Sequence, residues 1–142
     1  MTNLCLHNNI INNLICRKVY KLSKKIGKLD EKVIKLLNLN YMENKEIYIG
    51  EKNIEHMKRQ HPVDYKKYGK DIYNIIKNPT YVARNPNQGS IEYIKEYKIK
   101  NEFVLIAVRV TNNERLFVRT MFVMTERKIR IYLEKGYAKK YN

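Results

Sequence analysis

The chain has 142 residues, 44% of them hydrophobic, which is enough to bury one core and too few for two domains of ordinary size. Its 29 Lys and Arg against 14 Asp and Glu give a net charge of +15. We therefore expect a polyanionic partner, with nucleic acid ahead of an anionic membrane surface. The two cysteines have no second pair nearby, which excludes a disulfide framework and a zinc knuckle and favours the reducing cytoplasm. No apolar run has the length of a secretion signal or a transmembrane helix.

The first part of the chain has helical periodicity. Apolar residues recur at steps of four and three, like heptad a and d positions, at Ile15, Val19, Leu22, Ile26, Leu29, Val33 and Leu36. Two interpretations stay open: an amphipathic helix, bent at Gly27, that packs on the rest of the chain, or a helix for docking or dimerisation. We assign residues 1–44 to this helical extension and residues 45–142 to the folded domain.

Beyond residue 44 the pattern predicts a short strand, two helices and then a sheet. "EIYIG" is a strand ending at Gly50, residues 51–60 form a helix, and Pro62 begins a second helix that Asn78-Pro79 ends. From Thr80 the hydrophobic period becomes two, which predicts strands in "TYVAR", "SIEYIKEYKI", "FVLIAVRV", "LFVRTMFVM" and "KIRIYLEK". The expected fold class is α+β, with N-terminal helices packed on one face of a largely antiparallel sheet of about four to five strands.

Two histidines lie close together in "EHMKRQHP". His56 and His61 are about 140° apart around a continuous helix, so they should not share a face, and no third metal ligand follows at a suitable spacing. His61 precedes a proline, which places it at the junction of the two helices. It could serve there as a general acid or base, or simply cap the junction, and its position alone does not decide.

Arginines interrupt two hydrophobic strands. Arg109 in "FVLIAVRV" would be costly on a sheet face unless that face opens onto water or an anion. Arg119 and Thr120 are neighbours in the next strand, so strand geometry predicts that they point to opposite faces. Each arginine could also be a rim residue whose apolar stem covers the sheet. Arg84, before the "NPNQG" loop, adds a further cation nearby.

The runs "IYIGEKNIEHMKRQHPVDYKKYGKDIYNIIKNPTYVARN", "SIEYIKEY", "FVLIAVRV" and "LFVRTMFVM" together resemble the phage-associated nuclease domains of the barnase, EndoU, colicin and RelE-like (BECR) superfamily. The resemblance spans residues Ile47 to Tyr137, and the spacing "HP…NPTY" is its most specific part. It implies a metal-independent endoribonuclease that cleaves RNA by attack of the ribose 2′-OH on the adjacent phosphate, in a toxin or effector of a phage or mobile element. The expected partners are RNA and a cognate inhibitor or antitoxin, with no cofactor, no metal and no membrane.

The resemblance also implies roles for individual residues. His61 matches the histidine of the helix-end motif and would act as acid or base, Arg109 would clamp the phosphate, and Thr120 would form a hydrogen bond with the phosphate or with the histidine. The expected substrate-binding residues are His56, Arg84, Ser90, Tyr93 and Arg119. No histidine follows residue 61, so the second catalytic histidine of EndoU-type enzymes is missing and the second acid or base stays open.

Two alternative functions remain. One is a non-catalytic nucleic-acid-binding module, in which the twelve tyrosines stack on bases beside lysines that contact phosphates. The other is a phage structural protein that assembles through its heptad segment.

Overall fold

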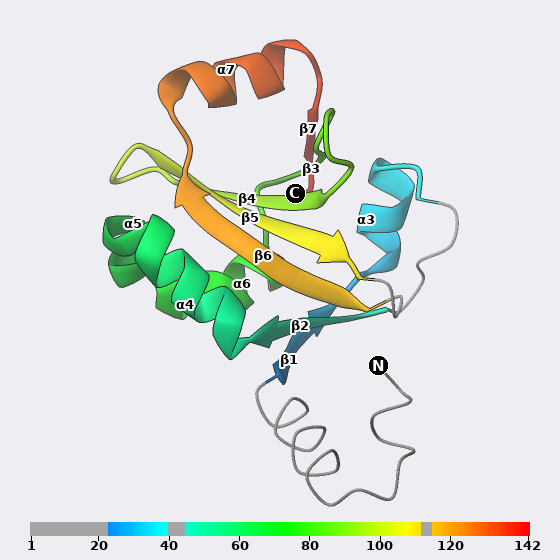
Figure 1. Ribbon diagram of the computed structural model, residues 1–142. Coiled ribbons are helices and arrows are strands. Elements are labelled where there is room, and N and C mark those ends of the chain that lie inside the picture. Colours follow the sequence, from blue (N-terminus) through cyan, green and yellow to red (C-terminus); the bar gives the residue numbers. More distant parts are fainter. Residues whose placement is uncertain (1–22, 40–44, 112–114) are drawn as a thin grey trace, which may run out of the picture.

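A seven-stranded sheet organises the molecule (Figure 1). The computed structural model describes residues 23–39, 45–111 and 115–142. The strand order is β1-β2-β6-β5-β4-β3-β7, and neighbours are antiparallel except for β2 and β6, which are parallel. The strands are β1 (Ser23–Lys28), β2 (Glu46–Gly50), β3 (Tyr81–Arg84), β4 (Ile91–Tyr97), β5 (Glu102–Val110), β6 (Leu116–Val123) and β7 (Ala138–Lys140). The helices are α3 (Glu31–Leu36), α4 (Glu51–Gln60), α5 (Pro62–Tyr68), a 3-10 turn (Gly69–Asp71), α6 (Ile72–Lys77) and α7 (Glu126–Glu134).

The larger hydrophobic core lies between one face of the sheet and the helices α3 to α6. It joins fully buried side chains of the sheet, such as Ile106 and Met121, to Val33 of α3, Met57 of α4 and Ile75 of α6. The predicted α+β class, the strand "EIYIG" and the helix over residues 51–60 are confirmed. The second predicted helix is also present, divided into α5, the 3-10 turn and α6. No helix in the described ranges is long and apolar enough to cross a membrane.

A smaller core lies on the opposite face, beneath α7. Ile94 and Leu105 of the sheet pack there with Ile129 and Tyr132 of α7. The prediction that all helices lie on one face and precede the sheet is therefore wrong.

The strand predicted in "KIRIYLEK" is wrong because this segment forms α7. The Thr125 hydroxyl caps its first turn by accepting a hydrogen bond from the Lys128 amide at 3.2 Å. The alternation of Ile129, Ile131 and Leu133 suited a strand, but the buried pair is Ile129 and Tyr132, three residues apart as on a helix face.

The sheet has more strands than predicted because it includes β1 at one end and β7 at the other. β1 falls in the segment that the heptad pattern assigned to a helix, and it pairs antiparallel with β2. Ile26, Leu29 and Val33 are indeed buried, yet they come from β1, from the connection that follows it and from the short helix α3. Asp30 caps the start of α3: one of its carboxylate oxygens accepts a hydrogen bond from the Val33 amide at 2.8 Å. The earlier heptad positions, and with them the proposed dimerisation helix, lie outside the described residues.

The contribution of β1 and α3 to stability can be tested by truncation. Deleting residues 1–39 removes Leu29 and Val33, which are 0% and 1% exposed, and uncovers the edge of β2. This should cost about 5 kcal/mol or more, a large part of the stability of a small domain, so cooperative thermal unfolding should be lost. Deleting residues 1–22 alone is the control, since it keeps β1 and α3. If both truncations melt alike, the boundary predicted at residue 44 is right.

The hydrogen bond of Tyr141, the last residue but one, leads us to expect a fall in stability at alkaline pH. Its hydroxyl donates to a carboxylate oxygen of Asp30 at 2.6 Å, and burial together with this bond raises the pKa of Tyr141 to about 12. Between the ordinary value of 10.0 and about 12, the unfolded chain loses this proton while the folded chain keeps it. The contribution to the free energy of unfolding is thus complete below about pH 10 and is lost as the pH rises through 12.

Urea unfolding at several alkaline pH values measures this effect. Tyr141→Phe should be less stable by about 1–2 kcal/mol at neutral pH and should lose less stability between pH 10 and 12 than the wild type. Equal losses in both proteins would show that the bond to Asp30 does not contribute in solution.

Candidate functional site

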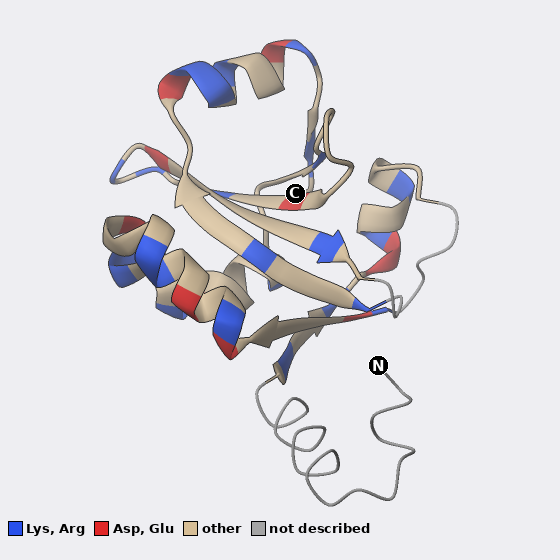
Figure 2. Cartoon of the chain, viewed as in Figure 1, with Lys and Arg blue, Asp and Glu red and all other residues tan. Residues whose placement is uncertain are grey.

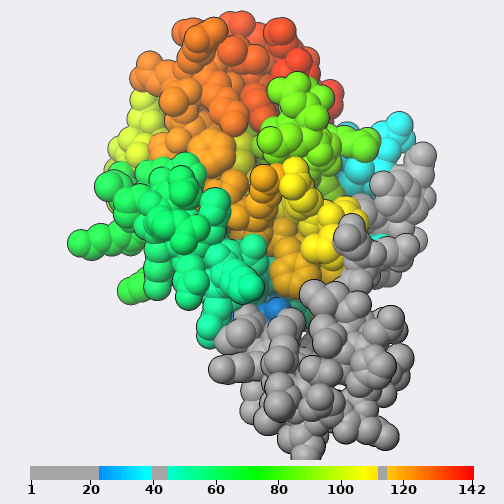
Figure 3. Space-filling view, in the orientation of Figure 1, coloured from blue at the N-terminus to red at the C-terminus, as the bar shows by residue number. Residues whose placement is uncertain are grey.

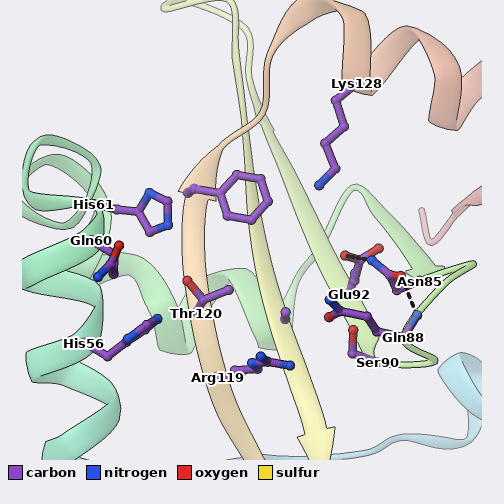
Figure 4. A pocket seen from close by; sticks show the side chains of 12 residues that line it. His56, Gln60, His61, Asn85, Gln88, Ser90, Glu92, Arg119, Thr120 and Lys128 are labelled. Carbon is purple, nitrogen blue, oxygen red and sulfur yellow. Dashed lines mark hydrogen bonds between the residues drawn. The ribbon is translucent and has the colours of Figure 1, made fainter.

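A polar hollow of about 320 Å³ opens on the face of the sheet that α7 covers, between the α4–α5 junction and the loop before β4 (Figure 3). One wall comes from the helices, the floor from β6, and the far wall from β4 and its preceding loop (Figure 4). The polar and charged side chains that line it are His56, Gln60, His61, Asn85, Gln88, Ser90, Glu92, Arg119, Thr120 and Lys128. Lysines and arginines also mark the surrounding elements (Figure 2).

The junction of α4 and α5 directs His61 into the hollow. α4 ends at Gln60, and His61 adopts φ −134° and ψ 60°, outside the helical region. Its amide donates to the carbonyl of Met57 at 2.8 Å and its carbonyl accepts from the Tyr65 amide at 2.9 Å. The backbone of His61 therefore closes the junction, which leaves its imidazole to line the hollow.

His56 lines the same hollow, one and a half turns earlier. The angle of about 140° applied to one continuous helix, and His61 has left that helical path, so the two imidazoles line one hollow without sharing a helix face. Among the described residues, no group of three or more His, Cys, Asp or Glu could hold a metal ion.

An open stretch of strand edge holds the junction in place. β2 pairs with β6 only at Leu116 and Phe117, so along this edge the later residues of β6 contact α4 and α5 and no other strand of the described ranges. There, a carboxylate oxygen of Asp64 in α5 accepts a hydrogen bond from the Val123 amide at 3.0 Å. This contact fixes the start of α5, and with it His61, against the end of β6.

The ring of Phe122 contacts both His61 and Lys128. The imidazole ring of His61 lies 5.5 Å from its ring, centroid to centroid. The ammonium of Lys128, from α7, lies 4.6 Å from the same centroid. Phe122 thus spaces the two groups along the rim of the hollow and supports both by packing.

A β-bulge in β6 turns two adjacent side chains the same way. Ala107 pairs with Thr120 and Val108 with Val118, which leaves Arg119 without a partner in the ladder. Arg119 and Thr120 consequently both line the hollow (Figure 4), and the prediction that they point to opposite faces is wrong. The Thr120 hydroxyl oxygen is buried and has no hydrogen-bond partner within the described part of the chain. Since an unmade bond of this kind costs about 1–3 kcal/mol, a bound phosphate oxygen would be a favourable partner.

Glu92 supplies a buried carboxylate on the far wall. It is 2% exposed and accepts hydrogen bonds from the Tyr132 hydroxyl at 2.7 Å and from the side-chain nitrogen of Asn85 at 3.3 Å. Burial and the bond to Glu92 raise the pKa of Tyr132, so that its hydroxyl stays protonated and continues to donate. Sequence reasoning missed Glu92, although a carboxylate amid the apolar residues of "SIEYI" is as unusual as the arginine of "FVLIAVRV". Lys128 was missed because its helix was predicted as a strand.

The structure brings some of the predicted residues together and separates others. His56, His61, Ser90, Arg119 and Thr120 share the hollow. Arg84 and Arg109 line a second hollow at the neighbouring end of the sheet.

Tyr93 cannot contact a substrate in this structure. It is 1% exposed and lies in the larger core, on the other face of the sheet, where burial raises its pKa. Its predicted role in substrate binding is therefore not supported.

The chemistry available in the hollow is proton transfer beside an anion. Imidazole and carboxylate groups can exchange protons, while Arg119, Lys128 and the Thr120 hydroxyl can hold and stabilise phosphoryl oxygens. A nuclease needs groups of these kinds, and here they lie together in one hollow of a small basic α+β fold. The model of the phage-Barnase-EndoU-ColicinE5/D-RelE like nuclease3 family matches residues 24–130, and the chain belongs to that family. The resemblance found in the sequence is thereby confirmed, and the match begins earlier, within β1. Neither the curated proteins nor the solved structures include a significant match.

The contact between Asp64 and β6 yields a test of how the site is positioned. Asp64→Ala leaves the Val123 amide without its acceptor and should lower the free energy of unfolding by about 1–3 kcal/mol in urea titrations. The NMR chemical shifts of the His61 ring protons, which lie beside the Phe122 ring, should also change, because the start of α5 is no longer held. Asp64→Asn keeps an oxygen acceptor and should lose less than half as much. Equal behaviour of both variants would rule out this anchoring role.

Proposed function

We propose that the protein is a metal-independent endoribonuclease that cleaves RNA by attack of the ribose 2′-OH on the adjacent phosphate. The observation that carries the proposal is the placement of His61 and Glu92 on facing walls of one hollow, with Arg119 and Thr120 on its floor (Figure 4). The membership of a nuclease family supports the reaction class. RNA as the substrate and independence from metals are parts of the proposal.

The reaction needs one group that takes a proton and one that gives a proton. Glu92 takes the proton of the 2′-OH as that oxygen forms its bond to phosphorus, since a carboxylate already accepting two hydrogen bonds has further lone pairs available. His61, as imidazolium, donates a proton to the 5′-oxygen as its bond to phosphorus breaks. The products are a 2′,3′-cyclic phosphate and a free 5′-hydroxyl, and Glu92 fills the place of the missing second histidine.

The remaining groups act on the phosphate. Negative charge grows on the non-bridging oxygens as the 2′-oxygen attacks, and Arg119 and Lys128 stabilise it from the floor and the rim. The Thr120 hydroxyl donates a hydrogen bond to one of these oxygens. In this proposal Arg119 takes the catalytic phosphate-binding role that the family resemblance implied for Arg109, because Arg109 lines a different hollow.

The same proposal makes the protein a cytoplasmic toxin or effector of a phage or mobile element, with a cognate inhibitor in cells that carry it. Its high positive charge supports tight binding to RNA but would also suit a protein that binds without cutting. Growth inhibition on expression, compared between the wild type and a variant without His61, separates the two. A variant equally toxic would point to binding alone.

His61→Ala should lower RNA cleavage by roughly 10²- to 10⁴-fold, because proton donation to the leaving oxygen is lost. RNA binding, measured by fluorescence anisotropy, should stay within a few-fold. Val63→Ala is the matched control: Val63 is two residues away, 74% exposed, and does not line the hollow. EDTA should have no effect, and a DNA strand should survive because it lacks the 2′-OH.

Glu92→Gln tests the second proton-transfer group. It should lower kcat/KM for RNA by roughly 10²- to 10⁴-fold, since an amide cannot take the 2′-OH proton. Tyr132→Phe removes a hydrogen bond to the same carboxylate but leaves the carboxylate itself, so it should lose much less activity. Undiminished cleavage by Glu92→Gln would assign the base to another group, and uncut RNA with pure wild-type protein would leave the non-catalytic binding module as the function.

A further inference from the structure

A second hollow of about 310 Å³ adjoins the first, at the end of the sheet where β3 and β5 finish and β4 begins. Arg84 and Arg109 line it, and Leu39 and the exposed Val110 are among its apolar lining residues. Gln88 and Ser90 line both hollows, so the two are separated only by the loop between β3 and β4. A chain-like ligand in the first hollow could therefore extend directly into the second.

The second hollow is suited to an anion. Arg84 and Arg109 are both exposed, and no carboxylate is among the described residues that line it. Neither guanidinium has an ion pair or hydrogen bond with another residue in the part of the chain that the structure describes. Two like charges that share one hollow repel each other, and a phosphate between them would remove that repulsion while accepting hydrogen bonds from both.

The loop that separates the hollows is internally braced. The Asn85 side-chain oxygen accepts hydrogen bonds from the amides of Asn87 at 2.9 Å and Gln88 at 2.8 Å. The backbone amide of Asn85 donates a hydrogen bond to the Ser90 carbonyl at 2.8 Å. Gly89, with φ +70°, makes the turn possible.

Asn85 also connects this loop to the reaction hollow. Its side-chain nitrogen is the group that donates to Glu92 at 3.3 Å. One residue thus fixes the geometry of both hollows before any ligand binds, which reduces the ordering cost of binding across them.

We propose that the second hollow binds the phosphate next to the one that is cleaved, so that the enzyme recognises a single RNA strand across two consecutive phosphates. This inference rests on the proposed nuclease function. It assigns Arg84 and Arg109 to substrate binding beside the reaction, and not to the reaction itself. The apolar lining residues suit the sugar or base that accompanies the second phosphate, as in other grooves that follow a single strand.

Short synthetic RNAs test the proposal. A dinucleoside monophosphate carries only the cleaved phosphate, and adding one phosphate to its 5′ or its 3′ end extends it in one direction. The wild type should cleave one of the two extended substrates with a kcat/KM on the order of 10-fold or more above that of the minimal one. The double variant Arg84→Ala, Arg109→Ala should lose this gain and cleave the minimal substrate at the wild-type rate.

A charge-matched control is available. Lys52→Ala, Arg130→Ala also removes two exposed cations, but neither residue lines either hollow. This variant should keep the preference for the extended substrate. An equal loss in the control would attribute the gain to overall charge and overturn the proposal.

Two further outcomes would overturn it. If the Arg84, Arg109 variant loses activity on the minimal substrate as well, these residues act in the reaction hollow. If it keeps the full gain on the extended substrate, the second hollow does not bind the strand.

Binding measurements keep the test independent of cleavage. For a short single strand, the slope of log K against log salt should become shallower by about 0.7 in the double variant, the value for one phosphate contact on a single strand. The 2′-deoxy form of the strand is used so that it is not cut. If the wild type cuts no RNA but this change in slope is found, the proposed reaction fails while the phosphate site stands. An unchanged slope would sink the phosphate site whether or not RNA is cut.

Discussion

The free edge of β6 is the constraint on which the site depends. Because β2 pairs with only the first residues of β6, the amides further along that edge need partners that the sheet does not supply. The Asp64 carboxylate satisfies the Val123 amide and so ties a helix, in place of a strand, to the edge. If β2 continued along β6, the helix junction could not approach, and His61 would have no contact with Phe122.

A second constraint comes from the buried carboxylate of Glu92. Tyr132 of α7 and Asn85 of the loop before β4 both donate to it, so it joins two elements that are far apart in sequence. Losing either donor would leave a buried charge less well compensated, which is costly. α7 consequently has two structural tasks: Ile129 fills the smaller core, while Tyr132 holds one wall of the site.

Local signals predicted much of this structure, and non-local pairing accounts for several of the errors. The break at His61 followed from Pro62 alone, and the helices around it from a period that lies within a few residues. Residues 23–28 form a strand because they pair with the edge of β2, about twenty residues away, and no local pattern contains that information. In the same way, the bulge that brings Arg119 beside Thr120 is a property of the register between β5 and β6. The sequence therefore identified basic and hydroxyl residues as candidates for the site, but it could not predict whether Arg109 or Arg119 lines the hollow.

The lysines of the terminal strands have a consequence for solubility. The described sheet ends in β1 and β7, and both present exposed lysines, Lys24 and Lys28 in the first and Lys139 and Lys140 in the second. Unpaired strand edges invite other chains to add to the sheet, and charges placed there make such stacking unfavourable. Part of the net charge of +15 is thus explained by protection against aggregation, independently of any nucleic acid. A variant neutralised at these edges would be expected to form intermolecular sheets at high concentration while its hollows keep their shape.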